Sequence, residues 1–329
     1  MSLVTSAIMF ALFLVLGAIM LYRAEIDLNA AQLFGKESTC ALRGFWSIII
    51  ILVHVPGGFQ NQLQDMVGSF AYIGVTFFFM TSAYGLKIIA SKQGITAFWR
   101  RRLPKLLIPL YLSNAITMLI HKKLTFWGLF SISGWVLWLL YCYFVFWLAH
   151  VMKLKHKDFS VCICVVFLSL YWFISKSSGG WPTEIYGFIW GILLANNMEK
   201  LQRELSLKHW LLQCIVIVVV SGLLGVSYLK YKPVLFYGSY LLKVCLGCSL
   251  LLLILCFTRG VKIGNKVNLF LGKISYETYL LHSAVMVAIA TIKPDLESAM
   301  FIVVSIASTL ILAVVIHRIS TVILKRIKL

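Results

Sequence analysis

Two ionisable residues stand at the ends of an apolar segment near the N-terminus. The stretch RGFWSIIIILVH places Arg43 and His54 eleven positions apart, with mostly apolar side chains between them. An ionisable residue inside a membrane helix is costly and is therefore a candidate functional residue by default. The imidazole of His54 is suited to taking up a proton near neutral pH, and the guanidinium of Arg43 is suited to binding phosphate.

The spacing places both residues on one face of a helix. At 100° per residue, eleven positions return to within about 20° of the starting direction, roughly 16 Å further along the axis. Residues 56–58, Pro-Gly-Gly, break the helix after His54, and the polar stretch FQNQLQD at 59–65 follows. Irregular backbone at membrane depth is tolerated inside protein or beside a cavity, so we expect His54 to face a cavity. Alternatively, Arg43 only anchors the helix and His54 only caps it.

A second segment, FWRRRLPKLLIP at 98–109, gathers cations in front of another apolar stretch. Arg100, Arg101, Arg102 and Lys105 fall within six positions. Because arginine offers planar, bidentate donors, the cluster is suited to the phosphates of a ligand. Simple anchoring on the cytoplasmic side of a membrane explains the same cluster, and both interpretations stay open.

A third segment, LGKISYETYLLH at 271–282, carries hydroxyl groups, a carboxylate and an imidazole along about two helical turns. These groups belong to Ser275, Tyr276, Glu277, Tyr279 and His282. Tyr279 shares a face with Tyr276 and with His282, since each lies three positions away. A membrane helix turns such groups toward the bundle interior. The alternative is a hydrogen-bonded seam between helices without a catalytic role.

The elements that position these segments are membrane helices. Of 329 residues, 61% are hydrophobic and only 12% are charged, which excludes an ordinary soluble domain. The apolar runs are continuous and approach the roughly 20 residues that cross a bilayer, which excludes a β-barrel and predicts an all-α polytopic bundle. We expect about eleven spans in one integral domain, near 2–22, 38–55, 69–90, 104–120, 129–152, 159–175, 183–197, 210–229, 235–257, 269–292 and 299–324.

The distribution of charge predicts the orientation of these spans. The net charge of +19 does not require nucleic acid, because the cations lie in loops beside apolar runs. Alternate crossing places twenty-three of the thirty Lys and Arg residues on one side and leaves Lys243 inside a span. The opposite side receives six, namely Lys122, Lys123, Lys176, Lys230, Lys232 and Lys293. We therefore expect an N-terminus outside, a cytoplasmic C-terminus, and a first helix that is retained rather than cleaved as a signal peptide.

The cysteines do not predict a metal site. Seven of the eight lie inside apolar spans and are expected to be buried free thiols. Cys245 and Cys248 have the CxxC spacing, but no second cluster supplies the remaining zinc ligands. We expect neither a metal nor a tightly bound cofactor.

The three segments, in this order, resemble the acyltransferase family 3 membrane proteins, which include bacterial polysaccharide O-acetyltransferases. Arg43 and His54 match the family's pattern of Arg, ten residues and His. YIGVTFFFMTSAYGL at 72–86 resembles its GV-x-x-FF-x-x-SG helix, with Ala83 in place of the usual Gly. Arg102 and Lys105 stand at the spacing of a paired arginine, and LGKISYETYLLH is close to LGKISY-x-x-YL-x-H. The resemblance covers about 40–324.

The resemblance implies a function and a division of the chain. Residues 38–329 would form the family-like membrane domain, preceded at 1–37 by an extra transmembrane helix and a cytoplasmic loop. The implied reaction transfers an acyl group, usually acetyl, from cytoplasmic acyl-CoA to a hydroxyl of a carbohydrate or cell-envelope acceptor. The implied location is the bacterial inner membrane.

The geometry of the segments fits that reaction. Arg43, Arg101, Arg102 and Lys105 would bind the phosphates of the co-substrate acyl-CoA, and its pantetheine arm would reach His54, the expected general base. Tyr276, Ser275 and Arg43 are candidate donors to the oxyanion. His282 would orient the acceptor or relay a proton, and Glu277 would fix an imidazole tautomer or pair with a cation. Direct transfer is favoured over a covalent acyl-enzyme.

Two other classes of protein fit parts of the pattern. A transporter or polysaccharide flippase also uses many spans, broken helices and buried ionisable groups, but it predicts internal repeats, and none is found. A non-catalytic sensor or assembly subunit would tolerate the loss of Arg43 and His54.

Overall fold

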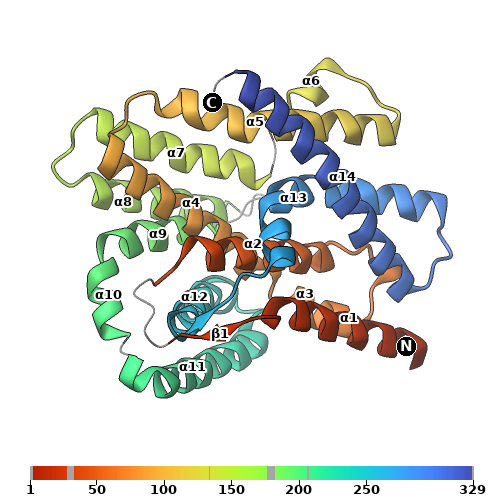
Figure 1. The fold of residues 1–329 in the computed structure, drawn as a ribbon, viewed down its shortest axis with the longest axis horizontal. Helices are drawn as coiled ribbons and strands as arrows, with labels where there is room; N and C mark the ends of the chain where they lie inside the picture. The colour runs from red at the N-terminus through yellow and green to blue at the C-terminus, as the bar shows by residue number, and fades with distance from the viewer. Residues whose placement is uncertain (1–2, 28–32, 133, 176–181, 206, 328–329) are drawn as a thin grey trace.

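The computed structural model describes residues 3–27, 33–132, 134–175, 182–205 and 207–327, which fold into a bundle of helices (Figure 1). The α-helices are α1 Leu3–Leu21, α2 Lys36–Val53, α3 Gln62–Gly68, α4 Ala71–Gln93, α5 Phe98–His121, α6 Phe126–Leu129, α7 Trp135–Val151, α8 Lys157–Ile174, α9 Tyr186–Asn196, α10 Met198–Glu204, α11 Trp210–Tyr231, α12 Lys243–Gly260, α13 Lys266–Ile292 and α14 Ser298–Arg326. A π-helix at Tyr237–Leu242 leads into α12, and the two-residue strands β1 Glu25–Ile26 and β2 Val261–Lys262 pair antiparallel.

A helix is present at each of the eleven predicted ranges. Two of the cations on which the predicted orientation depends, Lys176 and Lys328, lie outside the described residues. Seven helices of the described part are long and apolar enough to cross a membrane, counting α3–α4 and the π-helix with α12 as continuous stretches. Of the remaining four, α7 and α9 are shorter apolar helices, while α2 and α13 carry the ionisable segments. The prediction of an all-α polytopic bundle is confirmed.

Helix α2 lies near the middle of the bundle and is flanked by α4 and α13 (Figure 1). Alternate crossing predicts that α2 and α13 run in the same direction, and the structure shows them parallel. Their backbones touch where Gly44 meets Gly272, since a Cβ on either glycine would collide with backbone of the other helix. Small residues at such a contact let two membrane helices approach closely.

A second parallel pair joins α4 to α9. A Cβ on Gly187 would collide with the carbonyl group of Thr76, and a Cβ on Gly191 would collide with that of Met80. The two contacts are four residues apart on both helices, so α4 and α9 also run in the same direction. Gly187 and Gly191, the GxxxG pair of α9, therefore allow close packing of α9 against α4.

The break after α2 is shorter than the sequence pattern predicts. Helix α2 ends at Val53 and a 3₁₀ turn follows at Gly57–Phe59, as expected from Pro56 and the glycines. The expectation of irregular backbone through residue 65 is wrong, because α3 begins at Gln62. The cause is a capping box, in which the Asn61 side chain accepts from the Gln64 N–H and the Gln64 side chain accepts from the Asn61 N–H.

Candidate active site

His54 is the residue that caps the C-terminus of α2. Its Nδ1 lies 2.9 Å from the carbonyl oxygen of Ile50. Because a carbonyl oxygen can only accept, Nδ1 carries the hydrogen, which leaves the lone pair of the neutral ring on Nε2. The His54 side chain is exposed, so this basic nitrogen is open to a substrate.

His282 of α13 faces His54 with the same tautomer. Its Nδ1 lies 2.5 Å from the carbonyl oxygen of Tyr279, and its Nε2 is buried without a hydrogen-bond partner among the described residues. The centroids of the two imidazole rings are 4.6 Å apart, with an edge-to-face angle of 66°. The structure therefore brings together the two histidines of separate segments, and neither Nε2 has a hydrogen-bond partner among the described residues.

The position of this histidine pair follows from the register of the two parallel helices. His54 follows Gly44 by ten residues on α2, and His282 follows Gly272 by ten residues on α13. The pair therefore lies about 15 Å along the helices from the glycine contact. Helix α13 continues ten residues past His282 to Ile292, so His282 lies within its helix, whereas His54 lies at the end of α2.

A row of aromatic rings connects Arg43 to the histidine pair. The Arg43 guanidinium lies over the Phe78 ring at 5.4 Å, and Phe78 stacks on Trp135 at 6.1 Å. Trp135 contacts Tyr279 edge to face at 5.2 Å, and the Tyr279 ring lies 5.4 Å from that of His282. The rings come from α4, α7 and α13, so three helices build one side of the path between the predicted phosphate-binding residue and the predicted base.

Trp135 is a site residue that the sequence does not distinguish. It begins α7, is 5% exposed, and its indole Nε1 is buried without a partner in the described part of the chain. A tryptophan nitrogen is only a donor, and a buried donor without a partner is unfavourable. The indole is therefore suited to a ligand that brings an acceptor. Other tryptophans surround it in the sequence, such as Trp138, and no spacing marks one of them.

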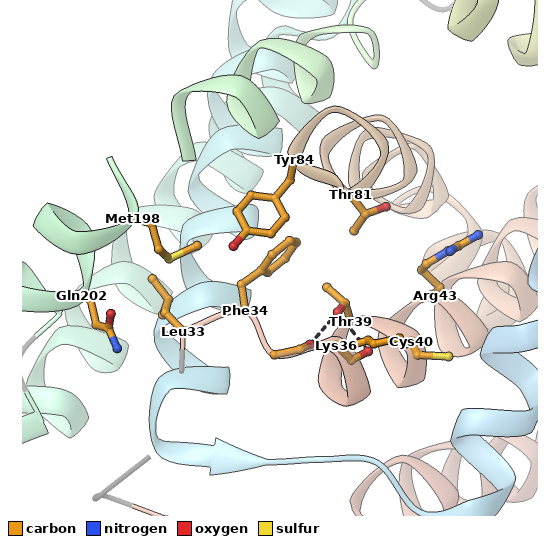
Figure 2. A pocket seen from close by; sticks show the side chains of 11 residues that line it. Leu33, Phe34, Lys36, Thr39, Cys40, Arg43, Thr81, Tyr84, Met198 and Gln202 are labelled. Carbon is orange, nitrogen blue, oxygen red and sulfur yellow. Dashed lines mark hydrogen bonds between the residues drawn. The ribbon is translucent and has the colours of Figure 1, made fainter. Parts of the chain in front are cut away.

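A cavity of about 610 Å³ opens at the N-terminal end of α2, where Arg43 lies. Figure 2 shows Arg43 and Thr81 at one end of this cavity and Met198 and Gln202 of α10 at the opposite end. The lining residues are Leu33, Phe34, Gly35, Lys36, Thr39, Cys40, Arg43, Thr81, Tyr84, Met198 and Gln202. The wall is mixed, with two cations, several hydroxyl groups and the edge-to-face pair of Phe34 and Tyr84 at 5.1 Å.

The basic segment of α5 divides into an inward and an outward part. Arg102 turns inward, since one of its terminal nitrogens is buried without a partner among the described residues. The Tyr143 hydroxyl is close enough to interact electrostatically with both Arg102 and Arg43. Arg101 is exposed and donates to Gln93 at 2.6 Å, and Lys105 is exposed as well. Of the four predicted phosphate-binding residues, Arg43 and Arg102 are thus the two that turn inward and interact electrostatically with Tyr143.

The remaining predicted residues of α13 have partners of their own. The Ser275 hydroxyl donates to the Gly272 carbonyl at 2.8 Å, and the Tyr276 hydroxyl donates to the Leu106 carbonyl at 2.9 Å. Both hydroxyl hydrogens are therefore occupied. Glu277 pairs with Nδ1 of His317 on α14 at 2.9 Å, so its partner is neither His54 nor His282. His317 lies outside the three segments, and no pattern in the sequence marks it.

The fold and the site define an integral membrane protein of many helices, with a mixed polar pocket at Arg43 that a row of aromatic rings connects to a pair of histidines. The sequence model of acyltransferase family 3, described as an acyltransferase domain, matches residues 41–318. The chain therefore belongs to this family and is a membrane acyltransferase. The matched range includes both histidines and Arg43 and begins after α1. No curated protein and no solved structure matches the chain.

Proposed function

We propose that the protein is an O-acetyltransferase that moves an acetyl group from cytoplasmic acetyl-CoA to a hydroxyl of a cell-envelope carbohydrate. The observation that carries this proposal is the His54–His282 pair, whose two unpaired Nε2 atoms are connected to Arg43 by the aromatic row. When a hydroxyl attacks a thioester, a base must take up the proton of that hydroxyl, and a neutral imidazole nitrogen can do so. We place the protein in a bacterial inner membrane with its N-terminus outside, as the distribution of Lys and Arg favours.

The cavity at the N-terminal end of α2 is the proposed donor site. In the proposed orientation it opens to the cytoplasm, where acyl-CoA is present. Arg43 and Lys36 in its wall, with Arg102 nearby, would bind the phosphates. The pantetheine arm would follow the aromatic row, and the roughly 16 Å between Arg43 and His54 would bring the thioester to the histidine pair.

The proposed reaction is a direct transfer. Nε2 of His54 takes the proton of the acceptor hydroxyl while that oxygen forms a bond to the thioester carbonyl carbon. The tetrahedral intermediate then collapses, the carbon–sulfur bond breaks, and the leaving thiolate takes the proton from His54. The products are the O-acetylated acceptor and free CoA. His282 would stabilise the proton on His54, because its own Nε2 is unpaired and adjacent.

Trp135 is the proposed donor to the oxyanion. Its buried Nε1–H has no partner in the described part of the chain, and its ring contacts Tyr279 beside His282. The earlier candidates fit less well, because the Ser275 and Tyr276 hydroxyls already donate to backbone carbonyls. Arg43 lies roughly 16 Å from His54 along α2, so it is placed to bind the phosphates of the donor rather than the oxyanion.

A covalent acyl-cysteine has no support in this arrangement. The cysteine nearest to the donor is Cys40, which lines the cavity one turn before Arg43. It lies fourteen residues before His54, or about 21 Å along the helix. No base of the histidine pair reaches that thiol, so direct transfer remains the proposal.

Purified protein in nanodiscs tests this proposal against its alternatives. The protein is incubated with radiolabelled acetyl-CoA and with envelope polysaccharide whose acetyl esters have been removed by mild base. An acetyltransferase releases one free CoA for each acetyl group that appears on the polysaccharide. A flippase moves polysaccharide across a sealed vesicle without releasing CoA, and a sensor or assembly subunit tolerates the loss of Arg43 and His54. Either of these two results contradicts the proposal.

A further inference from the structure

A second ionic site lies inside the bundle, away from the donor cavity. Nζ of Lys243 is 2.6 Å from Oε1 of Glu184. Glu184 lies two residues before α9, and Lys243 is the first residue of α12. Charged residues within membrane-spanning segments are costly, and a buried ion pair often adds little net stability. The pair therefore requires an explanation beyond packing.

The two partners differ in accessibility. The Glu184 side chain is 6% exposed, and its second oxygen accepts a hydrogen bond from the Thr183 hydroxyl at 2.9 Å. The Lys243 side chain is 22% exposed, and its ammonium group lies 4.8 Å above the Tyr72 ring. A lysine has three N–H donors, and two of those on Lys243 have no acceptor in the described residues. The ammonium is thus the end of the pair that a ligand can reach.

The backbone before Lys243 is a π-helix, a form that occurs frequently at functional sites. It places Tyr240 inside the bundle, where the Tyr240 hydroxyl lies 2.7 Å from the Ser169 hydroxyl and 3.0 Å from that of Tyr186. The Ser169 hydroxyl also donates to the Pro182 carbonyl. Hydroxyl groups of α8, α9 and the π-helix therefore form a largely buried hydrogen-bonded cluster, in which Tyr186 follows Glu184 by two residues and Tyr240 precedes Lys243 by three.

Tyr279 interacts with both the ion pair and the histidine pair. Glu184 is close enough to Tyr279 for an electrostatic interaction, and the Tyr279 ring contacts that of His282. Tyr72, under the Lys243 ammonium, is the second residue of α4, whereas Thr81 and Tyr84 further along α4 line the donor cavity. Nine residues separate Tyr72 from Thr81, or about 14 Å. The ion pair thus lies beside the start of α4, and the donor cavity lies beside its middle.

We propose that the Glu184–Lys243 pair, with Tyr72 and Tyr186, binds the carbohydrate acceptor and presents it to His54. This inference rests on the proposed function and adds the acceptor side. A paired ammonium and carboxylate carry no net charge, which favours the hydroxyl groups of an uncharged sugar over a phosphate or a carboxylate. Tyrosine rings beside such groups supply apolar faces for a pyranose ring and hydroxyls for its edge.

Four variants test this role in nanodiscs. Glu184→Gln and Lys243→Met each remove one charge, and the double exchange Glu184→Lys with Lys243→Glu restores an ion pair with its polarity reversed. The matched control is Lys87→Met with Asp158→Asn, which removes the 2.5 Å ion pair between α4 and α8. The acceptor is the base-treated envelope polysaccharide of the cells that produce the protein. The Michaelis constants for polysaccharide and for acetyl-CoA are measured separately, together with the yield of folded protein.

The two single variants are expected to raise the KM for the polysaccharide about tenfold or more, while the KM for acetyl-CoA stays within about twofold. The reversed pair is expected to restore the yield of folded protein but not the KM for polysaccharide. The control is expected to change neither constant.

Three results overturn the inference. They are an unchanged polysaccharide KM in both single variants, full recovery of that KM by the reversed pair, and loss of folded protein in all three variants of the pair, which assigns it to stability alone. A wild-type protein that acetylates no polysaccharide contradicts instead the proposed function.

Discussion

The imidazole rings of His54 and His282 meet at 4.6 Å because two parallel helices keep the same register over ten residues, from the Gly44–Gly272 contact onward. Two helices of one chain that cross a membrane in the same direction have an odd number of spans between them, and seven of the eleven predicted spans lie between α2 and α13, so this contact depends on the whole bundle. In the proposed mechanism the two rings share the proton that leaves the acceptor.

His282 and His54 are expected to act as a unit. His282→Ala leaves His54 without the neighbouring Nε2 and is expected to lower kcat by about ten- to a hundredfold. Adding His282→Ala to His54→Ala is expected to cost little more, because the first loss already removes the proton transfer. The measurement is kcat for CoA release in both single variants and the double variant. If the fold loss of kcat in the double variant equals the product of the two single losses, the two histidines have separate roles.

Trp135→Phe is expected to lower kcat by about ten- to a hundredfold with little change in the KM for acetyl-CoA. Phenylalanine keeps a ring against Tyr276 and Tyr279 but removes the indole N–H, and a lost oxyanion donor affects the transition state more than the bound substrate. The control is Trp138→Phe on the same helix, whose ring packs instead on Trp172 at 5.4 Å. Equal losses in the two variants would assign Trp135 to packing alone.

Gly44→Ala is expected to destabilise the protein and to separate the histidine rings. A Cβ at this position would lie 2.7 Å from the backbone nitrogen of Gly272, so α2 and α13 must move apart, at a cost of about 1–3 kcal/mol. Thermal unfolding in nanodiscs measures the stability, and CoA release measures the function. Gly222→Ala on α11, where a Cβ meets nothing within 4 Å, is the control and is expected to keep both. An active, fully stable Gly44→Ala protein would show that the register is not required.

Arg102→Ala and Lys105→Ala are expected to differ. One terminal nitrogen of Arg102 is buried and has no partner among the described residues, and both Arg102 and Arg43 interact electrostatically with Tyr143, whereas Lys105 is exposed. A buried arginine that binds phosphate contributes more than a solvated lysine, so Arg102→Ala is expected to raise the KM for acetyl-CoA by about tenfold or more and Lys105→Ala by less than about threefold. The comparison is made at two salt concentrations. The reverse order of effects would place the phosphates outside the bundle.

Much of the site follows from local patterns in the sequence. The helical period places Arg43 and His54 on one face of α2, and Pro56 predicts where that helix ends. The capping box at Asn61 and Gln64 is also a local signal, although the polar composition of the segment predicts irregular backbone instead. Local signals of this kind determine where helices begin and end.

The rest of the site depends on contacts between distant segments. Trp135 becomes a site residue only because α7 packs beside Phe78 and Tyr279. Glu277 pairs with His317, which lies forty positions later in the chain, on α14. Helix periodicity contains no information on which helices are neighbours. To predict a parallel contact such as that of α2 with α13, one must know how all the spans between these two helices cross and pack.

The most direct test of the mechanism is the turnover of His54→Ala, measured as acetyl groups transferred to base-treated envelope polysaccharide per folded protein in nanodiscs. The control is His150→Ala, because Nδ1 of His150 makes the same kind of hydrogen bond, to the Phe146 carbonyl at 2.8 Å, but its ring packs on Phe146 instead of a second imidazole. A general base contributes about 10² to 10⁴-fold to the rate. We predict that His54→Ala loses at least about a hundredfold while His150→Ala stays near wild type. Wild-type turnover by a folded His54→Ala protein would contradict the assignment of His54 as the base.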